Sequence, residues 1–166
     1  MVSLVVTDMI KRYLFAVILL FAGIMCRAQS LSLEELQSLT AMTTDQVHNY
    51  LIASKGFRCI GKTVLNGRNY EQFRSNRISP AITETISLGQ TTALMSGSNA
   101  RQVIYRTFRM QDLNSLLTQA KRSTMTMVFQ GSDAYQNIFR FDNSLFMTTI
   151  DVSLDKKSGT VQLDEK

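Results

Sequence analysis

Residues 32–57 of this 166-residue chain read SLEELQSLTAMTTDQVHNYLIASKGF, and the stretch carries the start signals of two helices. Ser32 and Glu35 have the spacing of a capping box, in which each side chain accepts a hydrogen bond from the other residue's backbone N–H. Thr43 and Gln46 repeat the same spacing shortly afterwards. Two helices in close succession are therefore predicted, each beginning at a defined residue.

Apolar residues follow both start signals at helical spacing, which gives each predicted helix one apolar face. They are Leu33, Leu36 and Leu39 in the first helix, and Val47, Tyr50 and Leu51 in the second. Gly56 stands where a helix C-terminus favours a left-handed residue, and Phe57 follows as its hydrophobic contact. The pair is expected to pack on a core and to lead into the next element at Phe57.

From Phe57 onward the apolar period changes towards two, which indicates strands. Asn66-Gly67 is typical of a type I′ hairpin turn, and a later run in which Leu113 and Leu117 share a face predicts one further helix. Strands are predicted at residues 57–64, 68–75, 82–88, 101–108, about 124–130, 134–141, 144–154 and 159–164. This order predicts an α+β fold: an antiparallel sheet of about six to eight strands with an N-terminal helical pair and one later helix.

A faint internal repeat is visible at a constant offset of 66 residues. Shared amphipathic periodicity is sufficient to explain the matches between the helical segments. The dipeptide Phe-Arg at 73–74 also matches the one at 139–140, and this match lies in predicted strands. Two explanations stay open: coincidence, or duplication of a helix-plus-sheet unit with pseudo-repeats at 43–108 and 109–166.

Residues 1–28 have the order of a secretory signal. Lys11 and Arg12 precede an uninterrupted apolar run, and Ala28 offers the small side chain that signal peptidase accepts before a cut. The apolar run is shorter than the roughly 20 residues that a membrane helix needs. Cleavage after Ala28 is predicted, which leaves residues 29–166 as a single α+β domain in an exported protein, periplasmic or extracellular.

Three alternatives at the N-terminus stay open. Translation could begin at Met9 instead of Met1, lipid could be attached to Cys26, or the apolar segment could be retained as a membrane tether. The residues ahead of Cys26 lack the small-residue pattern that lipoprotein processing prefers. Cleavage is therefore the favoured prediction.

The charge of the chain argues against nucleic acid as a partner. Loss of residues 1–28 removes three basic residues and one acidic residue, which lowers the formal charge from +5 to +3. A DNA-reading helix-turn-helix would carry basic residues on its second helix, where this chain has Asp45, His48 and Asn49. The low and scattered charge is not a nucleic-acid footprint.

Residues that usually carry catalysis are scarce. His48 is the only histidine, so it cannot complete a common zinc site with a second one, and it is expected on a solvated helix face. Cys59 is expected to be a buried small hydrophobe, with an intermolecular disulfide as the alternative. No Gly-rich phosphate loop and no Ser-centred nucleophile elbow is present. A non-enzymatic protein without metal or cofactor is predicted.

The acidic residues leave one enzymatic alternative open. Glu71, Glu84 and Asp151 lie on predicted strands. A small hydrolase or glycan-active protein would need some of them, or His48, to converge in a cleft. No spacing in the sequence selects a pair.

Arginine and aromatic residues gather on two predicted strands, and these residue types are enriched at protein interfaces. The candidate partner-binding residues are Arg68, Tyr70, Phe73, Arg74, Arg77, Tyr105 and Arg106. The alternative is that the rings belong to the core and that the arginines are its solvated flanks. We expect an unidentified protein of the cell envelope as the partner.

The Ala28-Gln29 junction, the motif LSLEEL and a second helix ending in KGF resemble the N-termini of small, uncharacterised exported proteins of Bacteroidetes-type bacteria. The element order is similar to that of the SmpA/OmlA outer-membrane-assembly lipoproteins and, if duplicated, to that of beta-lactamase-inhibitor proteins. These resemblances imply action through protein–protein contacts and no catalytic residue. Fold analogy alone does not transfer function. The sequence thus predicts an exported, non-enzymatic binding or accessory protein of the bacterial envelope.

Overall fold

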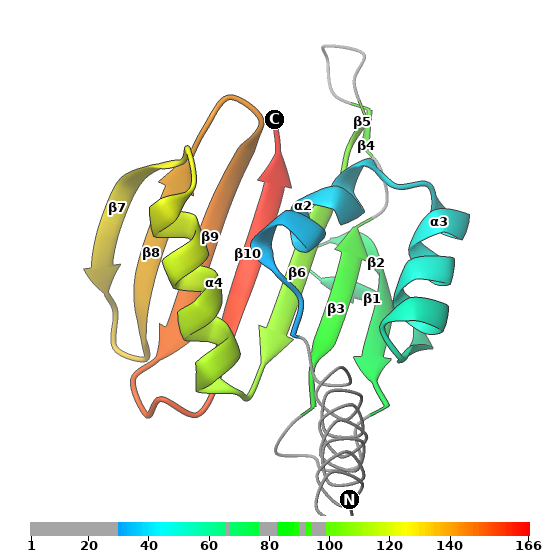
Figure 1. Ribbon diagram of the computed structural model, residues 1–166, viewed down its shortest axis with the longest axis horizontal. Coiled ribbons are helices and arrows are strands. Elements are labelled where there is room, and N and C mark those ends of the chain that lie inside the picture. Colours follow the sequence, from blue (N-terminus) through cyan, green and yellow to red (C-terminus); the bar gives the residue numbers. More distant parts are fainter. Residues whose placement is uncertain (1–29, 66, 77–82, 90–91, 94–98) are drawn as a thin grey trace, which may run out of the picture. The chain divides into compact units, whose positions relative to one another are not determined.

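An eight-stranded antiparallel sheet with helices on one face forms the described part of the chain (Figure 1). This confirms the predicted α+β fold class. The predicted signal segment, Arg77 and Pro80 lie outside the described residues. The computed structural model describes residues 30–65, 67–76, 83–89, 92–93 and 99–166.

The two predicted helix starts are confirmed. Helix α2 (Leu33–Ala41) begins at Ser32, and helix α3 (Thr44–His48) begins at Thr43, each with both hydrogen bonds of its capping box. The second helix differs from the expectation in one respect, because it continues as a π-helical turn, η2 (Asn49–Ser54). Gly56 ends the segment with a φ of +70°, the left-handed conformation predicted for it.

The strands follow the predicted segments closely. Their bounds are β1 Phe57–Leu65, β2 Arg68–Ser75, β3 Thr85–Gly89, β6 Gln102–Thr107, β7 Thr126–Ser132, β8 Gln136–Asp142, β9 Phe146–Ser153 and β10 Gly159–Glu165. Across the sheet their order is β1-β2-β3-β6-β10-β9-β8-β7. The predicted loop between β3 and β6 contains a short hairpin that the sequence did not indicate, β4 (Thr92–Ala93) with β5 (Asn99–Ala100). The later helix is α4 (Met110–Arg122).

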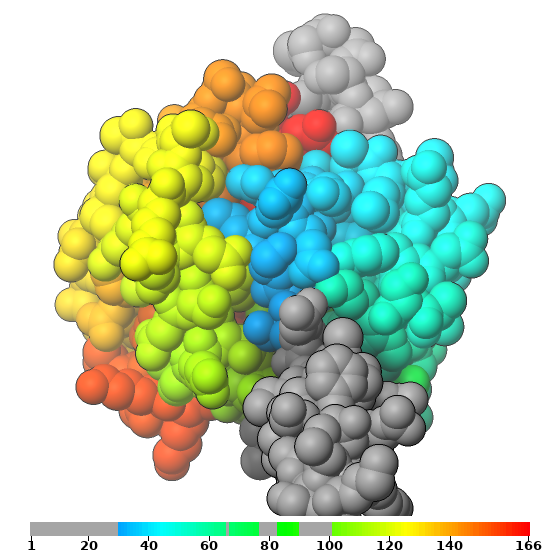
Figure 2. Space-filling view, viewed as in Figure 1, coloured from blue at the N-terminus to red at the C-terminus, as the bar shows by residue number. Residues whose placement is uncertain are grey.

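All of these helices lie on one face of the sheet, which we call the helix face (Figure 1). Figure 2 views the molecule from this side and shows the side chains of α2, α3 and α4 spread over the sheet. Phe73, Ile86 and Tyr105 stand side by side on β2, β3 and β6 and are fully buried beneath them. Burial of such side chains supplies about 1.5–3 kcal/mol each, so this face contains the main core.

The opposite side of the sheet, which we call the open face, carries the alternate residues of each strand. Of the described helices, none packs on it (Figure 1). Strand β9 shows the contrast, since Thr148, Ile150 and Val152 are buried while the residues between them are only half-buried. This alternation agrees with the apolar period of two that indicated strands from Phe57 onward.

The sheet consists of two similar halves. Strands β1, β2, β3 and β6 form one side and β7, β8, β9 and β10 the other, and β6 pairs with β10 at the junction. Each outer hairpin contains a bulge, at Ile60 in β1 and at Val128 in β7. When the two bulges are taken as equivalent positions, Phe73 corresponds to Phe141, which is an offset of 68 residues. The Phe-Arg match at an offset of 66 therefore does not mark structurally equivalent positions, and duplication itself stays a prediction.

In the part of the chain that the structure describes, no helix has both the length and the apolar character to cross a membrane.

Candidate functional site

A row of exposed arginines crosses the open face of the sheet. Arg58 on β1 stands directly opposite Arg74 on β2, and Arg74 is aligned through Thr85 of β3 with Arg106 on β6. All three arginines are exposed. We call Arg58, Arg74 and Arg106 the arginine row.

The arginine row has an energetic cost. Like charges that stand directly opposite each other on neighbouring strands destabilise a sheet, and Arg58 faces Arg74 in this way. Asp151 on β9 lies on the same line across the sheet as the three arginines, but Thr160 of β10 separates it from Arg106. Among the described residues, no ion pair to Arg58, Arg74 or Arg106 is formed. The Arg106 guanidinium instead lies over the Phe108 ring, 5.2 Å from its centroid.

Next to the arginine row, the open face carries a chain of polar side chains. The Tyr70 hydroxyl donates to Gln102, and the Gln102 amide donates to Asp164. Gln162 also donates to Asp164, at 2.9 Å. Burial, together with the nearby Asp164 carboxylate, raises the pKa of Tyr70. These hydrogen bonds join Tyr70, Gln102 and Gln162 to the Asp164 carboxylate in one network on the open face.

The predicted partner-binding residues divide between the two faces. Arg68, Tyr70, Arg74 and Arg106 belong to the open face, because they alternate with the core residues of β2 and β6. Phe73 and Tyr105 are fully buried on the helix face, so they are core residues and cannot contact a partner. Tyr70 is also buried, and Arg77 lies outside the described residues.

Arg58 is the functional candidate that the sequence did not indicate. In a hairpin without irregularities, the turn after Leu65 would place Arg58 opposite Ser75, on the helix face. The bulge at Ile60 shifts the pairing by one residue and turns Arg58 to the open face, opposite Arg74. Gly61, whose φ is +119°, was the available signal, because glycine in a strand often marks a bulge.

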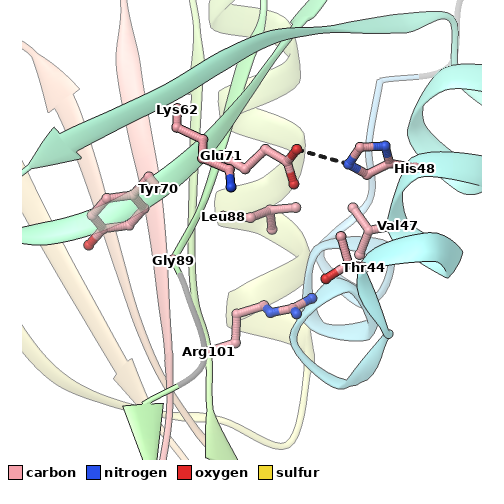
Figure 3. Close-up of a pocket in the computed structure, with 9 residues that line it drawn as sticks. All are labelled: Thr44, Val47, His48, Lys62, Tyr70, Glu71, Leu88, Gly89 and Arg101. Carbon is pink, nitrogen blue, oxygen red and sulfur yellow. Dashed lines mark hydrogen bonds and ion pairs between the residues drawn. The ribbon is translucent and has the colours of Figure 1, made fainter.

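On the helix face, a cleft of about 180 Å³ separates α3 from the sheet (Figure 3). Figure 3 shows the Glu71 carboxylate pointing to His48, and the two are joined at 2.9 Å between Oε1 and Nε2. The lining residues are Thr44, Val47, His48, Lys62, Tyr70, Glu71, Leu88, Gly89 and Arg101. The cleft is small and holds both signs of charge.

His48 is not the solvated residue that was expected. Its side chain is 36% exposed and is held by Glu71, and its ring meets Phe73 edge-on with 5.3 Å between the ring centroids. The contact ties α3 to β2. The expectation failed because helical periodicity places His48 off the apolar stripe but does not reveal that strand β2 lies on that side.

Cys59 is exposed, so the expectation of a buried thiol was wrong. The bulge at Ile60 lies directly after it, at the outer strand of the sheet. The thiol donates to Glu71 Oε1 at 3.6 Å, the same oxygen that contacts His48. A Cys–His nucleophilic pair would need the imidazole as the thiol's hydrogen-bond partner, and here the carboxylate has that place.

The other acidic candidates do not join this cluster. Glu84 is buried beside Ser75, whose hydroxyl accepts from its backbone N–H at 3.1 Å. Asp151 lies on β9 of the open face, where burial and the nearby Asp133 raise its pKa against the effect of Arg140. Within the described ranges, no three His, Cys, Asp or Glu side chains form a group that could hold a metal ion.

Comparison with protein-family models, curated proteins and solved structures finds no match to this chain.

Proposed function

We propose that this protein is an exported, non-enzymatic binding protein of the bacterial cell envelope that contacts an acidic surface of a protein partner through the open face of its sheet. The observation that carries the proposal is the arginine row. Arg58 and Arg74 repel each other across two strands, and folding gains nothing from that arrangement. A partner that supplies carboxylates would compensate the repulsion with bidentate arginine contacts.

The resemblance to small exported Bacteroidetes-type proteins and the signal-like residues 1–28 support the envelope as the location. Under this proposal the mature chain begins at Gln29. Intact-mass measurement of the protein recovered from the envelope tests it. A mass that includes residues 1–28 would favour the membrane-tethered alternative, and a mass increased by attached lipid would favour modification of Cys26.

The binding experiment compares charge reversal on the open face with an equal reversal elsewhere. The Arg74→Glu/Arg106→Glu variant is expected to lose the proteins that the wild type recovers from cross-linked envelopes. The control is Lys156→Glu/Lys157→Glu, which makes the same change in net charge in the exposed turn after β9. Equal recovery by both variants, or retention of only lipid or polysaccharide by the wild type, contradicts the proposal.

A small hydrolase is the second candidate, and one observation favours it: Cys59, His48 and Glu71 converge at one edge of the cleft. If the cluster is catalytic, the wild type hydrolyses a panel of activated esters and glycosides and Glu71→Gln abolishes this activity. Equal rates in the wild type and in Glu71→Gln would remove this candidate.

A further inference from the structure

The two outer strands of the sheet, β1 and β7, hold equivalent places but differ in charge. The matched bulges make Thr126 the counterpart of Arg58 and Gln130 the counterpart of Lys62. Strand β7, with the sequence TMVFQGS, contains no charged residue and no proline. Natural sheets protect their outer strands with charged side chains, lysine above all, because unpaired backbone groups there can pair with another chain. β1 has this protection and β7 lacks it.

The side chains of β7 add apolar surface to its unprotected backbone. Met127, Val128 and Phe129 are 38%, 55% and 46% exposed. The Phe129 ring lies over Gly131, where a Cβ atom would come within 2.7 Å of it, and the Arg140 guanidinium stacks on the ring at 5.9 Å from its centroid. The bulge at Val128 does not distinguish the two edges, because β1 has its own at Ile60.

We propose that β7 pairs with β7 of a second copy of this chain in antiparallel orientation, so that two sheets join into one. A two-fold axis at Phe129 places that ring beside its own copy and Val128 opposite Gln130. Aromatic and apolar cross-strand pairs stabilise a sheet, and no charge meets a like charge. Contacts of this kind, with the same patch on both partners, are the usual basis of two-fold dimers.

The charges that flank β7 select a second copy in this orientation. Arg122 precedes the strand and Asp133 follows it. Antiparallel pairing brings the basic end of one strand towards the acidic end of the other, whereas parallel pairing brings like charges together. The same operation on β1 has its axis at Gly61, the counterpart of Phe129, and sets Arg58 against Val64 and Lys62 against Ile60 of the copy, so each charged side chain meets an apolar one. The charge pattern thus favours β7 over β1 as the dimer contact.

This inference does not depend on the proposed function. The arginine row lies on the other half of the sheet, and a dimer through β7 leaves it accessible. Loss of dimerisation with retained partner binding, or the reverse, would separate the two proposals.

The test uses matched valines on the two outer strands. Val128 on β7 and Val64 on β1 are 55% and 64% exposed. We expect the wild type and Val64→Lys to dimerise with rising concentration in analytical ultracentrifugation, and Val128→Lys to raise the dimer Kd by about tenfold or more, as a lysine on an outer strand opposes pairing. A monomeric wild type at every concentration overturns the proposal, and so does a Val128→Lys variant that dimerises like the wild type.

A second variant keeps the test valid if Val128→Lys does not fold. Thr126→Arg/Gln130→Lys gives β7 the charges that β1 carries at equivalent positions, and it should likewise be monomeric with an unchanged circular dichroism spectrum. In a Cys59→Ser background, Phe129→Cys should form an intermolecular disulfide on oxidation, because residues opposite each other in antiparallel strands lie within disulfide reach. A dimer that does not cross-link through Phe129→Cys places the interface elsewhere and contradicts the proposal.

Discussion

Gly159 lies where helix α4 crosses the first residue of β10, and there is no room for a side chain. A Cβ atom there would lie 2.1 Å from the Leu113 side chain and 2.6 Å from the backbone oxygen of Asp151. Because the backbone oxygen cannot move away cheaply, Gly159→Ala should destabilise the protein by about 1–3 kcal/mol. Urea unfolding at neutral pH measures this.

The matched control for that substitution is Gly89→Ala. Its Cβ would meet the Tyr70 ring at 3.3 Å and the Gln102 backbone oxygen at 3.4 Å, contacts that a small adjustment relieves. The loss of stability should be clearly smaller than at Gly159. Equal losses would show that α4 does not press on β10 as described.

Glu35 gives the protein a predictable sensitivity to acid. Burial alone would raise the pKa of Glu35, but hydrogen bonds from Lys55, from the Ser32 backbone and from Tyr50 outweigh it and leave the pKa below its ordinary value of 4.5. A carboxyl whose pKa is lower in the folded state stabilises the protein above its unfolded-state pKa, and this contribution disappears as the pH falls through the folded-state pKa.

The Glu35→Gln variant tests that assignment. Its urea midpoint should be lower than that of the wild type at about pH 7 and should depend less on pH between about pH 5 and pH 3. An identical acid profile in variant and wild type would mean that other carboxyls dominate. The same variant also loses a charged partner of the Lys55 ammonium, which lies 2.5 Å from Glu35 Oε1.

Single residues also mark the limit of sequence reasoning for the candidate site. Arg74 and Arg106 could be predicted as solvated residues, since strand alternation sets them against Phe73 and Tyr105. Arg58 could not, because its face depends on the bulge at Ile60. The energy of a bulge depends on non-local packing, and a lone Gly61 only hints at it.

At the scale of elements, the position of Cys59 on the outer strand β1 predicts that its thiol is reactive in the native protein. Cys59 is exposed, and its thiol donates a long hydrogen bond of 3.6 Å to Glu71. The native protein should therefore react completely with a maleimide without denaturant. Electrophoretic mass shift or intact-mass measurement checks this. Labelling that requires urea would contradict the exposed position and would restore the buried thiol that the sequence suggested.

The helix boundaries were the most predictable features of the fold, because the signals that set them lie within a few residues of each boundary. A capping box and a C-terminal glycine act within a few residues, so α2, the start of α3 and the end at Gly56 could all be predicted. The π-helical turn η2 could not, because no capping signal marks its start and the Tyr50–Glu35 hydrogen bond within it joins residues of two separate helical segments. The small hairpin β4–β5 was also missed, since its strands have two residues each.

For the whole molecule, the junction of β6 and β10 implies that both halves unfold together. Val161 on β10 is fully buried between Tyr105 of β6 and Ile150 of β9. Val161→Ala should cost about 2 kcal/mol and lower the unfolding midpoint equally by far-UV circular dichroism and by tyrosine fluorescence, since coincident transitions indicate one cooperative unit. Transitions that separate in the variant would mean that the halves are independent domains.

The order in which the chain is synthesised gives the position of β10 one more consequence. Among the described strands β10 is made last, yet it lies between β6 and β9 and unites the sheet. A nascent chain that ends before Gly159 has the strands of both parts of the sheet, β1-β2-β3-β6 and β9-β8-β7, but lacks the strand that joins them. The complete eight-stranded sheet can therefore form only after residues 159–165 have left the ribosome.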